Sequence, residues 1–287
     1  MWAEAPLNAA VDIPGANLGN QNQRRVLYLA NAAQGQYFGT VHQLDDGSTA
    51  DYNAMLISVQ HRVASHFSVL ANYTLSHCIS GPFTSELDGL GYGNPANRNF
   101  DRGNCVGIDH RHLANFTALQ EAPKFSDKWV RAVASDWRFS EIIRIQSGIF
   151  FSVASGIDSA LNGNAGAQRA NFNGGNPYAN AACPATTQFC VPWISSATFS
   201  FPTTGTYGNL GSANILGPGT FQFDMSLVRT FPVRESQRVE VRAEAFNLLN
   251  HYQPGNPSAT LGTSSSFGQI TTGGQPRIMQ FAFKYIF

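Results

Sequence analysis

The sequence has few charged residues, no net charge and no long apolar run, and each absence excludes a class of protein. Lys, Arg, Asp and Glu make up 13% of the 287 residues, about half the fraction of a typical soluble domain. The 18 basic and 18 acidic residues cancel, which disfavours electrostatic capture of nucleic acid or of an anionic surface. No segment approaches the roughly 18–20 consecutive apolar residues of a membrane-spanning helix, so only strands could cross a membrane.

Motifs of common enzymes are also missing. The chain has no nucleophile elbow, phosphate-binding loop, paired metal-binding carboxylates or HExxH motif. Its clustered glycines lack the strand-Gly-helix context of a phosphate site, so we interpret them as loop residues. We therefore expect no enzymatic activity, no cofactor and no nucleic-acid partner.

Glycine and aromatic residues are abundant instead. The 27 glycines, 21 phenylalanines and nine tyrosines favour short strands, turns and polar loops over helices. The C-terminus shows the pattern most clearly, because successive side chains of a strand point to opposite faces. One face there is a row of large apolar side chains, which we expect to face lipid: Met279, Phe281, Phe283, Tyr285 and Phe287.

Alternation of this kind predicts an all-β, antiparallel fold with about seven strands. The predicted strands are residues 52–62, 67–77, 112–121, 137–147, 220–231, 238–248 and 277–287. Charged side chains alternate with apolar ones, which places them together on the opposite face, towards the lumen of a barrel: Arg138, Arg144, Asp224, Arg238, Glu240, Arg242, Glu244 and Lys284. They would form either a ladder of cross-strand pairs or a binding track, and we favour the ladder. Glu141 is the exception on the apolar side.

Connections of two lengths separate these strands. Short turns alternate with long, polar intervals near residues 78–110, 148–219 and 249–275. Short periplasmic turns and long extracellular loops are typical of outer-membrane β-barrels. Counting back from the terminal strand places all long loops outside and the C-terminus in the periplasm.

The same count leaves residues 1–51 as an extracellular loop or partial region, with residues 52–287 as barrel. Seven strands are fewer than the usual minimum of about eight. Residues 1–6 lack the basic start and apolar run of a secretory signal, although an outer-membrane protein must be exported. These observations predict the C-terminal part of a larger barrel.

Cysteines and histidines suggest two further features. Cys78 with Cys105, and Cys183 with Cys190, each share one predicted outer loop, so loop membership favours these two disulfides. His110 and His112 lie on one face of a strand, with His77 at the end of the preceding strand. A metal site would need a third ligand that the sequence does not specify, so we favour polar residues at an outer rim over a metal centre.

Several motifs resemble the C-terminal barrel of TonB-dependent outer-membrane receptors, especially the Oar-like type with a carboxypeptidase-regulatory-like domain. The resemblance runs from about residue 24 to the end and is strongest over 207–287. Its motifs are YTLSH (73–77), DHRH (109–112), GNLG (208–211), LGPG (216–219), FDMSL (223–227), RAEAFNLLNH (242–251), FGQI (267–270) and PR (276–277).

The resemblance implies energy-coupled uptake of a ligand across the outer membrane of a Gram-negative bacterium, through a barrel of about 22 strands. The implied partners are membrane lipid, an unidentified extracellular ligand, a plug and N-terminal barrel of the same receptor, and a TonB complex that contacts the receptor's N-terminal region. This chain shows no plug, so it would not transport alone. The alternatives are a secreted β-sandwich binding module and a structural barrel or pore formed by oligomerisation.

Overall fold

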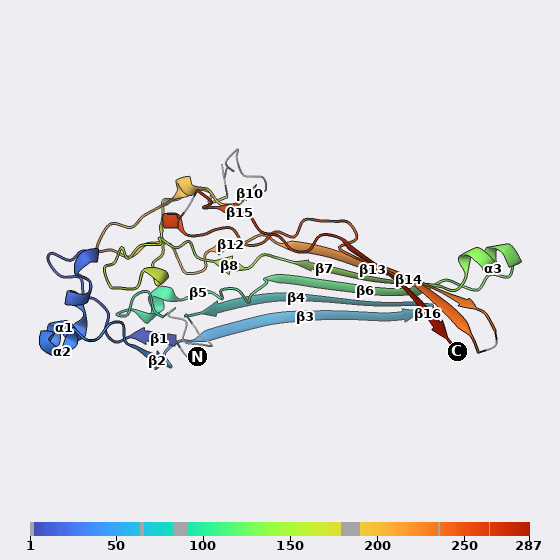
Figure 1. The fold of residues 1–287 in the computed structure, drawn as a ribbon, viewed down its shortest axis with the longest axis horizontal. Coiled ribbons are helices and arrows are strands. Elements are labelled where there is room, and N and C mark those ends of the chain that lie inside the picture. The colour runs from blue at the N-terminus through green and yellow to red at the C-terminus, as the bar shows by residue number, and fades with distance from the viewer. Residues whose placement is uncertain (1–2, 64–65, 83–90, 179–189, 235, 264) are drawn as a thin grey trace.

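A long curved β-sheet, with irregular structure gathered at one end, forms the molecule (Figure 1). The computed structural model describes residues 3–63, 66–82, 91–178, 190–234, 236–263 and 265–287. Among them, no helix has both the length and the apolar character needed to cross a membrane.

Seven long strands make up the sheet, and each corresponds to one of the predicted strands. In chain order they are β3 (Ala50–Val63), β4 (Phe67–Ser80), β6 (His112–Glu121), β7 (Trp137–Gln146), β13 (Thr220–Pro232), β14 (Arg238–Phe246) and β16 (Ile278–Ile286). Every pair of sequential strands is antiparallel and adjacent, giving the order β16-β14-β13-β7-β6-β4-β3, with β5 (Gly103–Asn104) added beside β4.

The strand bounds differ from the prediction by up to three residues, and two of these differences have identifiable reasons. β14 ends at Phe246 rather than at residue 248, because Asn247 takes a left-handed conformation (φ 52°) and donates its backbone N–H to Asp224. β4 extends to Ser80, three residues further than predicted. There, the Asp109 carboxylate accepts hydrogen bonds from the Ser76 hydroxyl and from the Cys78 backbone N–H.

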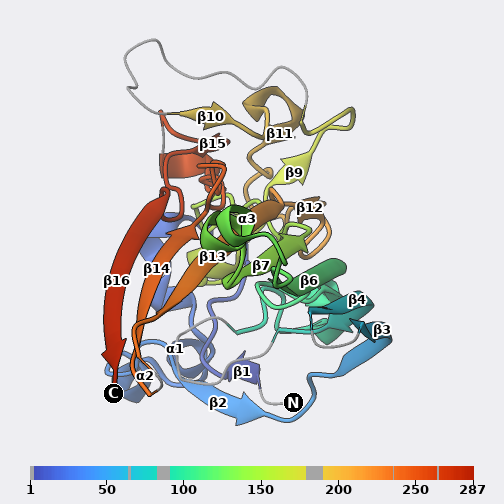
Figure 2. The same ribbon diagram turned by 90° about the vertical axis from the view of Figure 1, so that its right-hand side faces the viewer.

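The sheet is a single curved layer. Viewed along the strands, it forms an arch that runs from β16 over β7 to β3 (Figure 2). Among the described residues, β3 pairs only with β4, and β16 pairs only with β14. The arch therefore has two open edges and is not a closed barrel.

Register divides the sheet into a polar face and an apolar face. Glu240 lies opposite Lys284 on one side and Thr230 on the other, whereas Val241 lies opposite Phe283. Because each strand alternates, the same division continues across the sheet. The apolar face carries Met55, Ile57, Val59, Val69, Tyr73, Phe116, Phe139, Ile143, Ile145, Phe221, Phe223, Leu227, Phe231, Val241, Phe281 and Phe283.

Connections of the two lengths lie at opposite ends of the sheet. The connections 64–66, 122–136 and 233–237 lie at the end that also holds the C-terminus (Figure 1). The connection 122–136 contains a helix that the sequence did not predict, α3 (Lys128–Ala134).

Residues 3–49 and the described parts of the three long connections gather at the other end in a folded unit, which we call the loop cap (Figure 1). It contains β1 (Ala3–Pro6) paired with β2 (His42–Asp45), and the short helices α1 (Val26–Ala30) and α2 (Ala32–Gly35). Three two-residue ladders follow: β8 (Phe150–Phe151) with β12 (Ile215–Leu216), β9 (Asn171–Phe172) with β11 (Phe199–Ser200), and β10 (Val191–Pro192) with β15 (Gln269–Ile270). Its described 3-10 turns are η1 (Leu18–Asn20), η2 (Asn22–Arg24), η3 (Arg98–Asp101), η4 (Ala165–Ala167), η5 (Ser196–Thr198) and η6 (Leu261–Thr263).

Candidate functional site

The loop cap has its own hydrophobic core. Phe151, Val153, Ile194, Phe199 and Ile215 are buried together there, and Phe172 and Phe267 pack against them. The ring of Phe199 contacts both of those phenylalanines, at centroid distances of 5.6 and 6.0 Å. The described parts of the intervals predicted as long irregular loops therefore form a packed structure.

The loop cap also contains a buried ion pair. The guanidinium of Arg169 bonds the Asp101 carboxylate and donates to the backbone carbonyl oxygens of Phe100 and Leu210, both at 2.8 Å. It also stacks on the Phe100 ring, 4.3 Å from the centroid. The second Asp101 oxygen accepts the backbone N–H of Gly93 at 2.7 Å. Both charges are thus buried and paired, which is the condition under which buried charges are tolerated.

A second polar cluster ties the N-terminal segment to the long connection 147–219. Arg24 is buried and donates to the carbonyl oxygen of Leu161 at 2.8 Å. Next to it, Asn162 donates from its amide to the Gly93 carbonyl oxygen and to the Tyr207 hydroxyl. Asp158 accepts the backbone N–H groups of Asn162 and Gly163 at 3.1 and 2.7 Å. Segments far apart in the sequence are therefore fixed together by buried hydrogen bonds.

Burial also affects Tyr207, whose ring packs on Phe100 at 5.2 Å. Removal of its hydroxyl from water raises its pKa, the hydrogen bond from Asn162 opposes this, and the nearby carboxylates of Asp158 and Asp101 raise it further. The neutral phenol is the favoured form in the folded loop cap.

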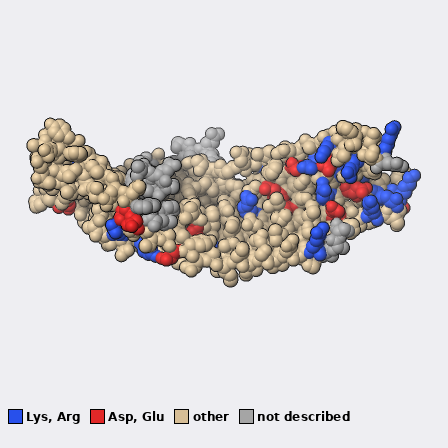
Figure 3. Space-filling model, turned by 90° about the horizontal axis from the view of Figure 1, so that it is seen from below, with Lys and Arg blue, Asp and Glu red and all other residues tan. Residues whose placement is uncertain are grey.

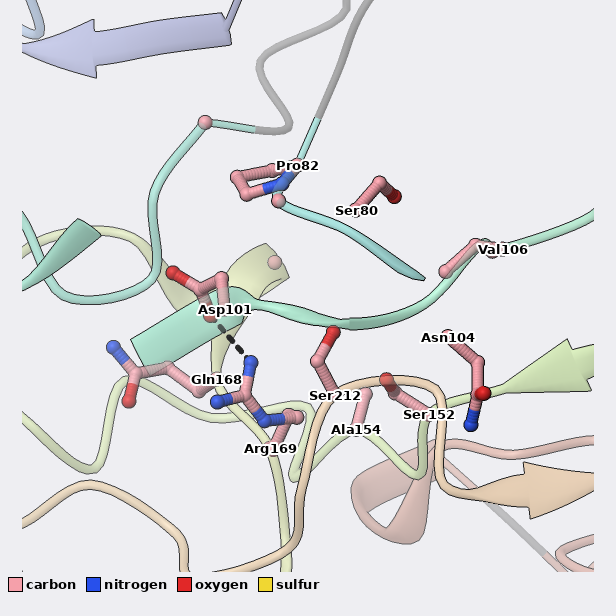
Figure 4. A pocket seen from close by; sticks show the side chains of 13 residues that line it. Ser80, Pro82, Asp101, Asn104, Val106, Ser152, Ala154, Gln168, Arg169 and Ser212 are labelled. Carbon is pink, nitrogen blue, oxygen red and sulfur yellow. Dashed lines mark hydrogen bonds and ion pairs between the residues drawn. The ribbon is translucent and has the colours of Figure 1, made fainter. Parts of the chain in front are cut away.

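A cavity of about 360 Å³ opens beside the Asp101–Arg169 pair. Figure 4 shows the side chains around it, which come from the end of β4, from the region of β5 and from the connection 147–219. Its lining consists of Ser80, Gly81, Pro82, Gly91, Asp101, Asn104, Val106, Ser152, Ala154, Gly166, Gln168, Arg169 and Ser212.

The described part of this lining offers hydrogen-bonding groups. Among the lining residues that the structure describes, the charged side chains are Asp101 and Arg169, and they neutralise each other. The hydroxyl oxygen of Ser152 accepts a backbone N–H at 2.8 Å, so its own proton remains available to donate. A volume of this size lies at the low end of the range for small-molecule sites, roughly 300–1,000 Å³.

The predicted lumen-facing charges all share the polar face of the sheet. Arg238, Glu240, Arg242 and Glu244 alternate on β14, and register adds the others from β7, β13 and β16. Glu240 contacts Arg242 at 2.9 Å and Arg138 at 3.6 Å. Seen from its concave side, the sheet shows acidic and basic groups intermixed towards the short-turn end (Figure 3). Glu240 and Arg242 belong to the same strand, and the contact with Arg138 spans β13. The charges therefore lie close to one another on this face, but these contacts do not pair adjacent strands, and the cross-strand ladder stays a prediction.

The apolar face lies on the convex side and is not covered by a second sheet in the part of the chain described. Phe281 and Phe283 are 75% and 71% exposed. Met279, Tyr285 and Phe287 are exposed in the same row. A β-sandwich would bury these side chains between two sheets, so the sandwich alternative does not fit this arrangement.

The predicted histidines do not converge. Nδ1 of His112 lies 2.8 Å from the Tyr73 hydroxyl, and Nδ1 of His110 lies 2.6 Å from the Ser147 carbonyl oxygen. His77 is exposed on the strand β4. Within the described ranges, no group of three or more His, Cys, Asp or Glu side chains could hold a metal ion.

The cysteines stabilise the loop cap. A disulfide joins Cys78, at the loop end of β4, to Cys105, with the two Cα atoms 5.4 Å apart. Cys190 is also disulfide-bonded. Cys183, its predicted partner, lies outside the described residues.

Sequence reasoning missed the cavity and its ion pair, although one signal was present. Asp158 and Arg169 are the only charged residues in the interval 147–219, and both are buried. An isolated charge in a long neutral loop needs a partner if the loop folds. That rule would have identified Asp158 and Arg169 as buried, paired residues. It would not have identified their partners, which come from other segments of the chain.

Comparison with known proteins supplies the family. No curated protein matches the chain. A family model described as "Outer membrane beta barrel domain" matches residues 1–280, nearly the whole sequence. The match agrees with the antiparallel sheet, its exposed apolar face and its paired charges on the opposite face. The chain belongs to the outer membrane beta barrel domain family and is an outer-membrane β-barrel protein.

Proposed function

We propose that this chain forms the C-terminal wall and external loops of a TonB-dependent receptor of the Oar-like type, which takes up an unidentified ligand. One observation carries the proposal: the described parts of all three long connections meet at one end of an amphipathic sheet and fold into a cap with a cavity. The sequence motifs that resemble this receptor type support it. The role is binding and transport, without enzymatic chemistry.

The orientation follows from the two kinds of connection. In outer-membrane barrels, short turns face the periplasm and long loops face the exterior. We therefore place the loop cap outside the cell and the C-terminus in the periplasm. The cavity beside Asp101 and Arg169 then faces the medium, where it would contact the unidentified extracellular ligand.

The arch needs further strands to work in a membrane. Unpaired backbone groups in hydrocarbon cost several kcal/mol each, and the described sheet leaves one edge of β3 and one edge of β16 without neighbours. We propose that the rest of the same receptor closes the barrel and supplies the plug. The arch alone would not transport, and the TonB complex would act through that other region.

Purification from native membranes tests the proposal. An affinity tag inserted at residue 174, in a turn of two glycines with open space around them, would allow detergent extraction of the intact assembly. We expect a single larger polypeptide that includes plug sequence and cross-links to a TonB-type protein. Recovery of copies of this chain alone would contradict the receptor and favour an oligomeric pore. Release without detergent would contradict both and favour a secreted module.

A further inference from the structure

The helix α3 extends beyond the short-turn end of the sheet, on the convex side (Figures 1 and 2). It lies in the connection 122–136 between β6 and β7, whereas the other two connections at this end contain no helix among their described residues. A simple hairpin would join these strands with a few residues, so the helix requires another explanation.

Specific hydrogen bonds fix its position. The Asp127 carboxylate caps its first turn by accepting the backbone N–H groups of Trp129 and Val130, both at 2.9 Å. At its other end, the indole N–H of Trp137 donates to the Val133 carbonyl oxygen at 2.8 Å. Arg229, on β13, donates to the Ala132 carbonyl oxygen. The helix is therefore held in one orientation by contacts with β7 and β13.

That orientation turns apolar side chains outwards. Trp129 is 79% exposed and Val133 is 69% exposed. Their four-residue spacing places them on one side of the helix, with exposed Val130 beside them. Burial of an indole is strongly favourable, so a fixed helix that keeps Trp129 exposed implies a surface that covers it.

Basic residues surround this apolar side. Lys124, Lys128 and Arg131 are all exposed in the connection 122–136. The same connection carries Asp127, which caps the helix, and Asp136, so its three basic residues exceed its acidic ones by one. This small positive excess complements an anionic partner.

We propose that α3 is an interfacial anchor that inserts Trp129 and Val133 into the head-group region of the adjacent leaflet, with its basic residues against anionic phospholipid. Tryptophan concentrates at this level of a bilayer, and short amphipathic helices bind there through apolar insertion and basic residues. Trp137 lies on the convex face at the end of β7 and is hydrogen-bonded to the helix. The helix therefore adjoins the face that contacts lipid when the strands cross the membrane. The inference requires that the strands of the sheet cross the outer membrane, and it does not require the proposed receptor activity.

Tryptophan fluorescence in vesicles tests the anchor directly. The intact protein and Trp129→Phe are reconstituted in phosphatidylcholine–phosphatidylglycerol vesicles, with lipids brominated either near the glycerol or near the chain ends. The difference between the two emission spectra isolates Trp129. We expect it to be quenched several-fold by the shallow bromines and little by aqueous acrylamide. Trp193→Phe is the control, because Trp193 packs in the loop cap.

A double variant tests whether the lysines near α3 contribute to its binding of anionic lipid. Lys124→Gln combined with Lys128→Gln should reduce the shallow quenching of Trp129 in vesicles containing phosphatidylglycerol, and leave it unchanged in pure phosphatidylcholine. Quenching of Trp129 by acrylamide alone would overturn the proposal and favour a protein partner at α3. Equal quenching with and without the two lysines would overturn the role of anionic lipid.

Discussion

Individual polar residues hold the loop cap together, and Arg169 is the clearest case. It connects three segments through the Asp101 carboxylate and two backbone carbonyl oxygens. Loss of one partner of a buried ion pair leaves the other charge without compensation. The effect of Arg169 on stability should therefore far exceed that of a surface ion pair.

Arg169→Met is expected to reduce the opening free energy of the loop cap by about 3–5 kcal/mol. Hydrogen exchange measures it at the Gly93 amide, which donates to Asp101. The matched control is Arg102→Met, because Arg102 pairs with the largely exposed Asp51 and should cost about 0–1 kcal/mol. Similar losses for the two variants would contradict the assignment of Arg169 as the central residue of the cap.

Because of Tyr207, the stability of the loop cap should depend on pH in the alkaline range. Burial raises its folded pKa, whereas the unfolded phenol titrates near 10. Its contribution to stability is therefore complete below about pH 10 and is lost as the pH rises through the folded pKa. Tyr207→Phe removes this titration, so the wild type should lose stability relative to the variant above about pH 10. Hydrogen exchange of the loop cap measures the stability of both proteins. A stability difference between wild type and Tyr207→Phe that stays constant with pH would contradict the titration of Tyr207.

Strands were predictable from sequence because their side chains alternate, and all seven long strands lie within a few residues of their predicted positions. The short elements of the loop cap were not. Each two-residue ladder pairs segments distant in sequence, such as β10 with β15, and has no periodicity of its own. The helix α3 escaped prediction because seven residues are too few to establish a helical period.

Glu141 is the one acidic side chain that β7 places on the convex face. Register sets it between Ala118 and Met225, within the apolar rows. A carboxylate facing lipid is unfavourable, though less so than Arg or Lys. Glu141→Leu should therefore stabilise the protein in bilayers by roughly 1–2 kcal/mol, measured by reversible unfolding from vesicles.

Glu244→Leu is the matched control on the opposite face. Glu244 contacts Arg242 at 3.5 Å, so its removal should give no gain and a loss of up to about 1 kcal/mol. Stabilisation by Glu244→Leu with destabilisation by Glu141→Leu would mean that the two faces have been assigned the wrong way round.

Two different kinds of packing operate in the whole molecule. The buried hydrophobic cluster lies in the loop cap, whereas the sheet carries its apolar side chains outwards on the convex face. In water this arrangement would leave a large apolar surface exposed, which soluble monomers avoid. In an outer membrane the same surface faces lipid, and the paired charges of the concave face remain away from it.

Tryptophan scanning of β16 in brominated bilayers tests this central claim most directly. Phe281→Trp and Phe283→Trp should be quenched by lipid bromines and protected from acrylamide. Gln280→Trp and Ala282→Trp, on the concave face, should show the reverse, so that quenching alternates with a period of two residues. Uniform quenching along the strand, or acrylamide access to positions 281 and 283, would contradict the membrane-facing assignment of the convex face.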